Sequence, residues 1–331
     1  MYKNILVGLD GSDCSDLAID PAISLASHEK NARITGCHVY SANMHKSRFA
    51  DMENGLPEDY KGAGLNHLRK AHNELIYSGL KLISESYLEG LSKKSKELGI
   101  NYESIVLEGR NYIQLIRLAD QLRPDLAILG ASGQSREKDI GSTAERFLLY
   151  SKGADVLLMR KQWNGKGKTI VVGFDGSQDS LFALRRALEI GAKLDMEVKA
   201  VSVFDPFFHS GVFRQLSSSL SQEAKEKFDF SSQEKIHDQI IDKGLENLYR
   251  EMLEKGLQRA GSSKEDIHAE VAAGEVSRKI QEYASSNKAN LVVLGRWGLH
   301  REPQSLIGSH SLRLARDLEG NILIVSASHE N

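Results

Sequence analysis

The stretch NILVGLDGS at residues 4–12 decides the fold, because it returns as TIVVGFDGS at residues 169–177. In both places a run of apolar residues ends in Gly-x-Asp-Gly-Ser. Asp10 and Asp175 therefore stand 165 positions apart (175 − 10). So long a match at so large a separation indicates an internal duplication, two copies of one domain in a single chain.

The same offset of 165 relates other landmarks of the two halves. An apolar stripe that steps by four, three and four residues, as one face of a helix does, occurs in both copies. The related positions are Gly109 and Gly274, Gly130 and Gly295, Gly133 and Gly298, and the stripes Ile76, Leu80, Ile83, Tyr87 and Ile241, Leu245, Leu248, Met252. We expect a first domain at 1–160, a basic, glycine-containing linker at 161–167 and a second domain at 168–331.

Short apolar runs alternate with amphipathic segments in each half. The expected strands are 3–9, 33–40, 101–107, 125–130 and 154–160, then 168–174, 196–203, 266–272, 290–295 and 321–326. Helices are expected at 15–29, 66–98, 111–122 and 142–152. This alternation predicts an α/β fold, two tandem doubly wound domains, each a parallel sheet with helices on both faces.

The totals exclude several classes of protein. The 331 residues carry a net charge of −2, so no electrostatic attraction to nucleic acid is expected. No apolar run approaches a membrane span, and the N-terminus lacks the apolar core of a signal peptide. Cys14 and Cys37 have no metal-type spacing and suggest no disulfide framework. We therefore expect a cytoplasmic protein without membrane insertion.

Glycines and a carboxylate recur where ligands bind in such folds, at the carboxyl ends of the strands. Asp10 and Asp175 end the first strand of each half, a Gly-x-x-Gly ends the fourth, and Gly-Ser opens the last helix. Glycine allows close approach to peptide N–H groups, and a helix N-terminus adds free N–H donors and partial positive charge. Together these features predict an anion cradle, with phosphate as the expected guest.

Simpler interpretations exist for the same residues. A glycine after a strand is often only a turn, and Ser142-Thr-Ala-Glu145 has the pattern of a capping box, which needs no ligand. The Walker loop is excluded because its full pattern, Gly-x4-Gly-Lys-Ser/Thr, does not occur, and the dinucleotide fingerprint because these glycines follow the fourth strand. The ordered set of strand-end Asp, Gly-x-x-Gly and Gly-Ser is more specific than any one of its parts.

This arrangement resembles the universal stress protein (UspA-like) family. GRWGLHREPQSLIGS at 295–309 matches the family's nucleotide motif, Gly-x2-Gly-x9-Gly-Ser/Thr, and the resemblance covers both halves as a tandem form. It implies a five-stranded parallel sheet of order 3-2-1-4-5 in each domain. Some members of the family bind ATP, and others lack the motif and do not.

The resemblance implies an ATP site in the second half. Asp175 is expected near the adenosine and Val203 near the adenine. The ribose and phosphates are assigned to Gly295, Arg296, Gly298, Gly308, Ser309, His310 and Ser311, with Arg296 adding charge unless it is a solvated side chain. Trp297 is expected to shield the loop rather than stack on the base.

The first half departs from the motif. Only seven residues, 134–140, separate Gly133 from Gly141, against the nine residues 299–307 of the second half. The first site is therefore expected to be distorted, selective for a smaller anion, or empty. Its matching residues are Asp10, Val39, Gly130, Gly133, Gly141 and Ser142.

The leading hypothesis is an ATP-binding regulatory stress-response protein, with Mg²⁺ accompanying the nucleotide and no resident metal site. Asp10 and Asp175 are expected to accept hydrogen bonds rather than to hold metal or orient water, so a slow ATPase or adenylyl-transferring enzyme is the alternative. The fifth strand of each domain is a sheet edge that needs cover. In the family such edges pair between domains or subunits, which implies an intrachain pseudo-dimer and suggests a homodimer.

Two long insertions, 41–65 and 205–235, support a third hypothesis. The second insertion contains FDPFFHSGVF, from Phe204 to Phe213, which is rich in Phe. It is expected to be a lid or packing segment over its own domain. The alternative is a scaffold that has no nucleotide and binds a partner or an apolar ligand through these insertions.

Overall fold

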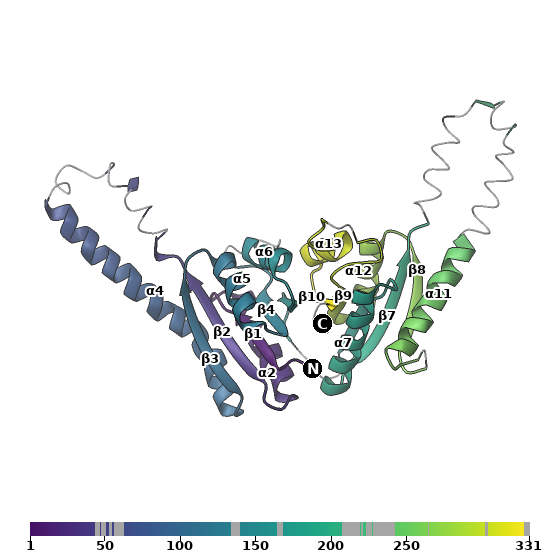
Figure 1. The fold of residues 1–331 in the computed structure, drawn as a ribbon, viewed down its shortest axis with the longest axis horizontal. Coiled ribbons are helices and arrows are strands. Elements are labelled where there is room, and N and C mark those ends of the chain that lie inside the picture. The colour runs from purple at the N-terminus through teal and green to yellow at the C-terminus, as the bar shows by residue number, and fades with distance from the viewer. Residues whose placement is uncertain are drawn as a thin grey trace. The chain divides into compact units, whose positions relative to one another are not determined.

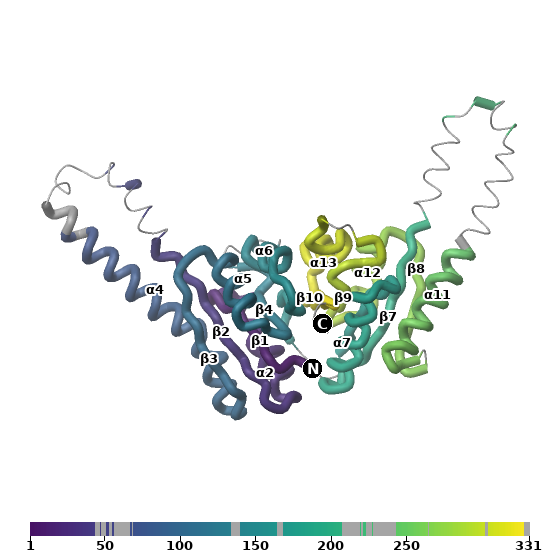
Figure 2. The backbone as a smooth tube through the Cα atoms, in the orientation of Figure 1, coloured from purple at the N-terminus to yellow at the C-terminus, as the bar shows by residue number. Residues whose placement is uncertain are grey.

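The computed structural model describes residues 1–43, 47, 51–52, 55, 63–133, 140–163, 168–206, 219, 221–222, 227, 242–263, 265–301 and 304–327. The chain divides into two compact units, Met1–Trp163 and Asn164–Asn331. Figures 1 and 2 show that strands and helices alternate in both units. Most of the two long insertions lies outside the described residues.

The first unit is a five-stranded parallel sheet covered by helices. Its strands follow the order β3-β2-β1-β4-β5, as the family resemblance implied. Long helix α4 packs against β2 and β3. In chain order the elements are β1 (Asn4–Gly8), α1 (Asp13–Asp16), α2 (Ile19–Ser27), β2 (Arg33–Tyr40), α4 (Ala63–Glu97), β3 (Asn101–Glu108), α5 (Asn111–Leu122), β4 (Leu126–Gly130), α6 (Ser142–Tyr150) and β5 (Asp155–Met159).

The second unit repeats this topology, with the order β8-β7-β6-β9-β10. Helix α7 packs against β6 and β9, and α11 against β7 and β8. The elements are β6 (Thr169–Gly173), α7 (Gln178–Leu194), β7 (Glu197–Phe204), α11 (Asp242–Arg259), β8 (His268–Ala273), α12 (Val276–Ser286), β9 (Ala289–Gly295), α13 (Ser309–Asp317) and β10 (Asn321–Val325). The predicted α/β class and duplicated fold are confirmed.

The central strands are apolar because both faces of the sheet are covered. In β4, the side chains from Leu126 to Leu129 are at most 5% exposed, and so are the β9 side chains from Leu291 to Leu294. Burial on both faces explains why these strands appear in the sequence as continuous apolar runs rather than alternating ones.

The first predicted helix, 15–29, is instead two helices, α1 and α2. Pro21 lies in the first turn of α2. Proline has no backbone N–H, and its ring clashes with the carbonyl four residues earlier, which here belongs to Leu17. Arg186 stands at the corresponding position of the second copy, and α7 runs unbroken through it.

Strand register shows which residues of the two domains correspond. Gly8 pairs with Cys37 in the first sheet, and Gly173 pairs with Val201 in the second. Cys37 therefore corresponds to Val201, an offset of 164 (201 − 37) rather than 165. It follows that His38 corresponds to Ser202, Val39 to Val203 and Tyr40 to Phe204.

Candidate functional site

In each domain a large cavity lies at the carboxyl ends of the central strands. The cavity of the second domain measures about 570 Å³ and that of the first about 530 Å³. Both volumes lie within the range of small-molecule sites, about 300–1,000 Å³. In the second cavity, eight of the nine residues expected at the nucleotide line the wall, namely Asp175, Val203, Gly295, Gly298, Gly308, Ser309, His310 and Ser311.

Asp175 holds the glycine loop of the second domain in place. One carboxylate oxygen accepts the backbone N–H of Ser177 at 3.0 Å, and the other accepts the backbone N–H of Leu299 at 3.1 Å. The N–H of Asp175 itself donates to the Ser180 hydroxyl at 3.4 Å. Asp175 thus joins the end of β6 to the residue after Gly298.

Two glycines of the motif are required by close packing. A Cβ on Gly298 would lie 2.6 Å from the Asp175 carboxylate, so a side chain there would displace this carboxylate. A Cβ on Gly295 would lie 2.7 Å from backbone atoms of Asp179 and Ser180 at the start of α7. Gly295 is therefore needed by the fold itself, and Gly298 keeps the cavity open beside Asp175.

The N-terminus of α13 faces the same cavity. Gly308 is its N-cap, and no side chain caps this end. The Ser311 hydroxyl donates to the carbonyl of Gly295 at 2.7 Å, and the His310 ring lies 3.0 Å from the Ser277 hydroxyl. The first-turn N–H groups add partial positive charge to the wall, as an anion site requires.

The remaining wall of the second cavity is apolar. The side chains that supply it are Phe174, Val201, Val203, Ile280, Leu294 and Ile307, all of which are buried. The Ser202 hydroxyl donates to the carbonyl of Phe174 at 2.7 Å and fixes the end of β6 against β7. An apolar wall beside an anion cradle suits a ligand with a flat ring at one end and negative charge at the other.

Arg296 lies away from the cavity, unlike the other residues expected there. Its side chain is 4% exposed, and its Nε donates to the carbonyl of Leu306 at 3.3 Å. Burial lowers the pKa of Arg296 to about 10, against the opposing effect of nearby Asp179. Arg296 thus supports the glycine loop on the side away from the cavity.

The cation that lines the second cavity is Arg301, which the sequence did not single out. Its guanidinium carbon lies 3.9 Å from the centre of the Trp297 ring. Trp297 also lines the cavity, and its backbone N–H donates to Asp179 at 3.0 Å. The sequence did contain one signal for this arginine. Arg136 and Arg301 both stand three residues after the second glycine of the Gly-x-x-Gly pair in their own half.

The first cavity is lined by all six residues expected there: Asp10, Val39, Gly130, Gly133, Gly141 and Ser142. The shortened loop falls mainly at 134–139, outside the described residues. Gly141 is the N-cap of α6, and no side chain caps this end. The capping-box interpretation of Ser142 is therefore wrong, because Ser142 is already the first residue within the helix.

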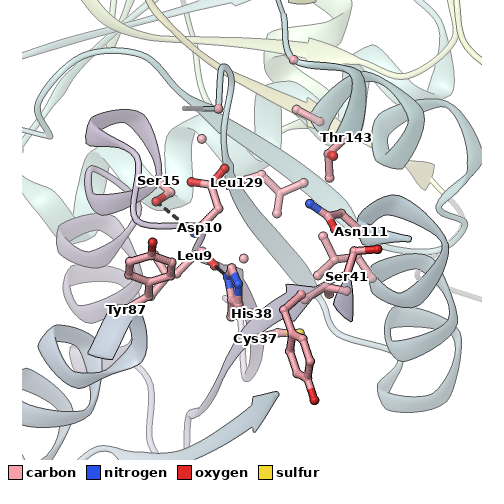
Figure 3. A pocket seen from close by; sticks show the side chains of 18 of the residues that line it. Leu9, Asp10, Ser15, Cys37, His38, Ser41, Tyr87, Asn111, Leu129 and Thr143 are labelled. Carbon is pink, nitrogen blue, oxygen red and sulfur yellow. Dashed lines mark hydrogen bonds between the residues drawn. The ribbon is translucent and has the colours of Figure 1, made fainter. Parts of the chain in front are cut away.

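The lining of the first cavity is more polar than that of the second. Asp10, His38 and Tyr87 gather on one side, and Asn111 and Thr143 lie across from them (Figure 3). His38 Nδ1 lies 2.6 Å from the carbonyl of Leu9, so His38 takes the structural place of Ser202. Burial lowers the pKa of His38, against opposing effects of the Leu9 carbonyl and Asp10.

A neutral His38 that donates from Nδ1 leaves Nε2 as an acceptor. Its ring meets the ring of Tyr87 edge-on, with the centres 5.1 Å apart. Neither His38 nor Asn111 was expected at the site, because only the strand register and the start of α5 place them there. The corresponding residues of the second domain are Ser202 and Val276, so the two cavities differ in chemistry although they are similar in size.

Other types of site find little support in the described part of the chain. No group of three or more metal-ligating side chains occurs there. Cys14 and Cys37 are both free, and burial raises the pKa of Cys37 to about 12. None of the described helices is long and apolar enough to cross a membrane.

Comparison with known sequences agrees with the duplication. The model of the universal stress protein family matches residues 1–160 and again residues 167–326. Universal stress protein MJ0531 of Methanocaldococcus jannaschii is 29% identical over 163 residues, which are 48% of this chain and 81% of that protein. Universal stress protein YxiE of Bacillus subtilis is 27% identical over 162 residues, 48% of this chain and all of that protein.

A solved structure matches the chain over nearly its whole length. A universal stress protein from Archaeoglobus fulgidus superimposes with a TM-score of 0.60 at 16% identity. The superposition covers 97% of each chain. At this level of identity the likeness concerns the fold alone.

Proposed function

The chain belongs to the universal stress protein family, and we propose that it is a regulatory protein that binds ATP in the cavity of its second domain. ATP acts there as a sensed or structural ligand whose binding stabilises the folded second domain. A ligand that binds only the folded state contributes stability in proportion to the logarithm of its concentration above Kd. ATP supply and protein stability would thereby be linked.

One observation carries the proposal: an apolar wall and an anion cradle share one cavity of about 570 Å³. The Val203 and Phe174 side would receive the adenine, and Asp175 lies where the ribose would be. The phosphates would meet the N–H groups around Gly298 and at the start of α13. The residues present therefore fit ATP, with Mg²⁺ carried mainly by the phosphate oxygens.

The contacts of Asp175 favour a ligand site over a catalytic one. Both of its carboxylate oxygens already accept backbone N–H groups, from Ser177 and Leu299. A carboxylate occupied in this way serves as a structural acceptor rather than as a base for an attacking water. We therefore expect bound ATP to persist for hours with Mg²⁺. Metal-dependent turnover that Asp175→Ala abolishes would instead establish the slow ATPase.

The experiment that tests the proposal is a count of nucleotides per chain. The protein is purified without added nucleotide and denatured, and the released nucleotides are quantified by chromatography. ATP is then titrated into the emptied protein. About one ATP per chain is expected, because only the anion cradle of the second domain is proposed to bind it.

Matched variants assign the ATP to a domain. Gly298→Val places a side chain against Asp175, and Gly133→Val does the same against Asp10, where a Cβ would lie 3.2 Å from the carboxylate. Loss of ATP in Gly298→Val but not in Gly133→Val is expected. If the emptied wild-type protein binds no ATP on titration, the proposal is wrong and the scaffold hypothesis gains weight. Two ATP per chain would mean that the first domain also binds it.

A further inference from the structure

The second cavity contains a cation whose position is fixed by an aromatic ring. Arg301 is exposed and lines the cavity together with Gly298, Gly308 and Ser309, which form its anion cradle. Its guanidinium carbon lies 3.9 Å from the centre of the Trp297 ring, well within the range of a cation–π contact. An exposed arginine is ordinarily free to sample many rotamers, so a stacked one is held in place in advance.

Trp297 is itself anchored at both ends. Its backbone N–H donates to the buried carboxylate of Asp179 at 3.0 Å, and its ring Nε1 donates to the carbonyl of Ser305 at 3.4 Å. Asp179 also accepts the backbone N–H of Ala327 at 3.1 Å. The ring that supports Arg301 is thus tied to α7, to the glycine loop and to the segment after β10.

Stacking leaves the hydrogen-bonding capacity of Arg301 available. The five N–H donors of a guanidinium lie in its plane, whereas the contact with Trp297 uses its face. Within the part of the chain that the structure describes, no carboxylate forms an ion pair with Arg301. Asp179 acts on it only at longer range and is itself engaged by two backbone N–H groups.

We propose that Arg301, stacked on Trp297, binds the outer phosphates of the nucleotide and makes the second domain select a nucleoside triphosphate over a monophosphate. The proposal rests on ATP binding in this cavity. Planar guanidinium forks match pairs of phosphate oxygens, and hydrogen bonds between charged groups are stronger than neutral ones. The N–H groups of α13 and the glycine loop cannot supply a full positive charge, and Arg301 does.

The two histidines of this wall have other surroundings. His310 lies 3.0 Å from the Ser277 hydroxyl, in the first turn of α13. His300 adjoins Arg301 and is exposed. Neither ring is stacked on the platform that fixes Arg301, so Arg301 is the residue with a prepared geometry.

The first domain lacks this platform. Ser132 stands where the second domain has Trp297, and its hydroxyl lies 3.1 Å from the Cys14 thiol. Serine offers no aromatic face on which a guanidinium can stack. Selection by phosphate number is therefore a property of the second domain.

The test compares the affinities of ATP, ADP, AMP and adenosine for the full chain. The variants are Arg301→Gln, which removes the charge, and Arg301→Lys, which keeps the charge but not the planar fork. Arg313→Gln is the matched control, because Arg313 lies on α13, pairs with Glu275 and Asp317, and does not line the cavity. Melting temperatures without nucleotide verify that each variant is folded.

Arg301→Gln is expected to weaken ATP binding by about 10-fold or more, which corresponds to about 1.4 kcal/mol. Adenosine affinity should stay within about 2-fold, because no phosphate is present to lose a contact. AMP should change little, Arg301→Lys should recover part of the ATP affinity, and Arg313→Gln should leave all four affinities unchanged.

Three outcomes would overturn the inference. ATP affinity unchanged in a folded Arg301→Gln protein would mean that the side chain does not reach the phosphates. An equal loss for ATP and adenosine would mean that Arg301 only shapes the loop. Failure of the wild-type protein to bind any adenine nucleotide would remove the proposed function itself and, with it, this inference.

Discussion

The Asp175 carboxylate accepts the backbone N–H of Leu299 at 3.1 Å, and this bond ties the glycine loop to the end of β6. The two residues are 124 positions apart in the chain. The other carboxylate oxygen accepts the backbone N–H of Ser177, which fixes the orientation of the carboxylate. The position of the glycine loop therefore depends on both oxygens being acceptors. An anion cradle built from backbone N–H groups works only when those groups are held in the right place.

Asp175→Asn should therefore weaken ATP binding. The amide keeps one acceptor oxygen and puts N–H donors where the other was, so either Ser177 or Leu299 loses its partner. We expect about a 10-fold lower ATP affinity and a loss of about 1 kcal/mol in stability. Calorimetric titration and denaturant unfolding measure the two effects. Asp10→Asn makes the same change in the first domain and should leave ATP binding by the second unaltered.

Two serines of α13 should respond differently to replacement by alanine. The Ser311 hydroxyl is engaged with the Gly295 carbonyl, so Ser311→Ala should cost about 1 kcal/mol in stability and change ATP affinity little. Ser309 is exposed at the cradle, and none of the described protein groups hydrogen-bonds its hydroxyl. Ser309→Ala should lower ATP affinity by about 10-fold while stability stays unchanged. The reverse pattern in titration and unfolding would place the Ser311 hydroxyl on the ligand.

Gly256 and Gly244, both in α11, provide a matched pair for packing. A Cβ on Gly256 would lie 2.2 Å from the ring of Phe174, whereas a Cβ on Gly244 would meet nothing within 4 Å. Gly244→Ala should stabilise the protein by about 0.5–1 kcal/mol, as is usual within a helix. Gly256→Ala should instead destabilise it by about 1–3 kcal/mol through overpacking. Denaturant unfolding measures the stability of both variants. A Gly256→Ala protein that is more stable than wild type would show that Phe174 moves aside without strain.

His38 should make the stability of the first domain fall in mild acid. Burial lowers its folded-state pKa below the ordinary 6.5, against the Leu9 carbonyl and Asp10, which raise it. Well above pH 6.5, His38 is neutral in both the folded and the unfolded state, and it contributes no pH dependence. As the pH falls below 6.5, the unfolded chain takes up a proton that the folded state disfavours, so stability decreases.

His38→Ser should flatten this part of the stability curve. Serine is the residue that the second domain uses at the corresponding position, where Ser202 donates to the Phe174 carbonyl at 2.7 Å. The variant therefore keeps a donor for the carbonyl of Leu9 while it removes the titrating ring. Unfolding free energies measured from pH 7.5 downward test this expectation. An unchanged pH profile would mean that another group causes the acid sensitivity.

The fold could be predicted from the sequence because its signals are local and occur twice. Apolar runs, helical stripes and the repeated Gly-x-Asp-Gly-Ser determine where the strands and helices lie. Parallel connection then brings every strand's carboxyl end to the same edge. Asp175, Gly298 and Gly308 were expected to meet for that reason, and the structure places them around one cavity. The break between α1 and α2 also has a signal in the sequence, because Pro21 cannot continue a helix from the turn before it.

Only the tertiary structure decided which side chains face the cavity. Arg296, Trp297 and Arg301 are close in sequence, yet Arg296 is buried behind the loop and the other two line the cavity. His38 lines the first cavity because of the pairing between β1 and β2. This pairing relates the second strands of the two domains by 164 positions, whereas the sequence repeat has an offset of 165. The physical reason is that side-chain direction depends on loop path and strand pairing, which are set by contacts such as that between Asp175 and Leu299, more than a hundred residues apart.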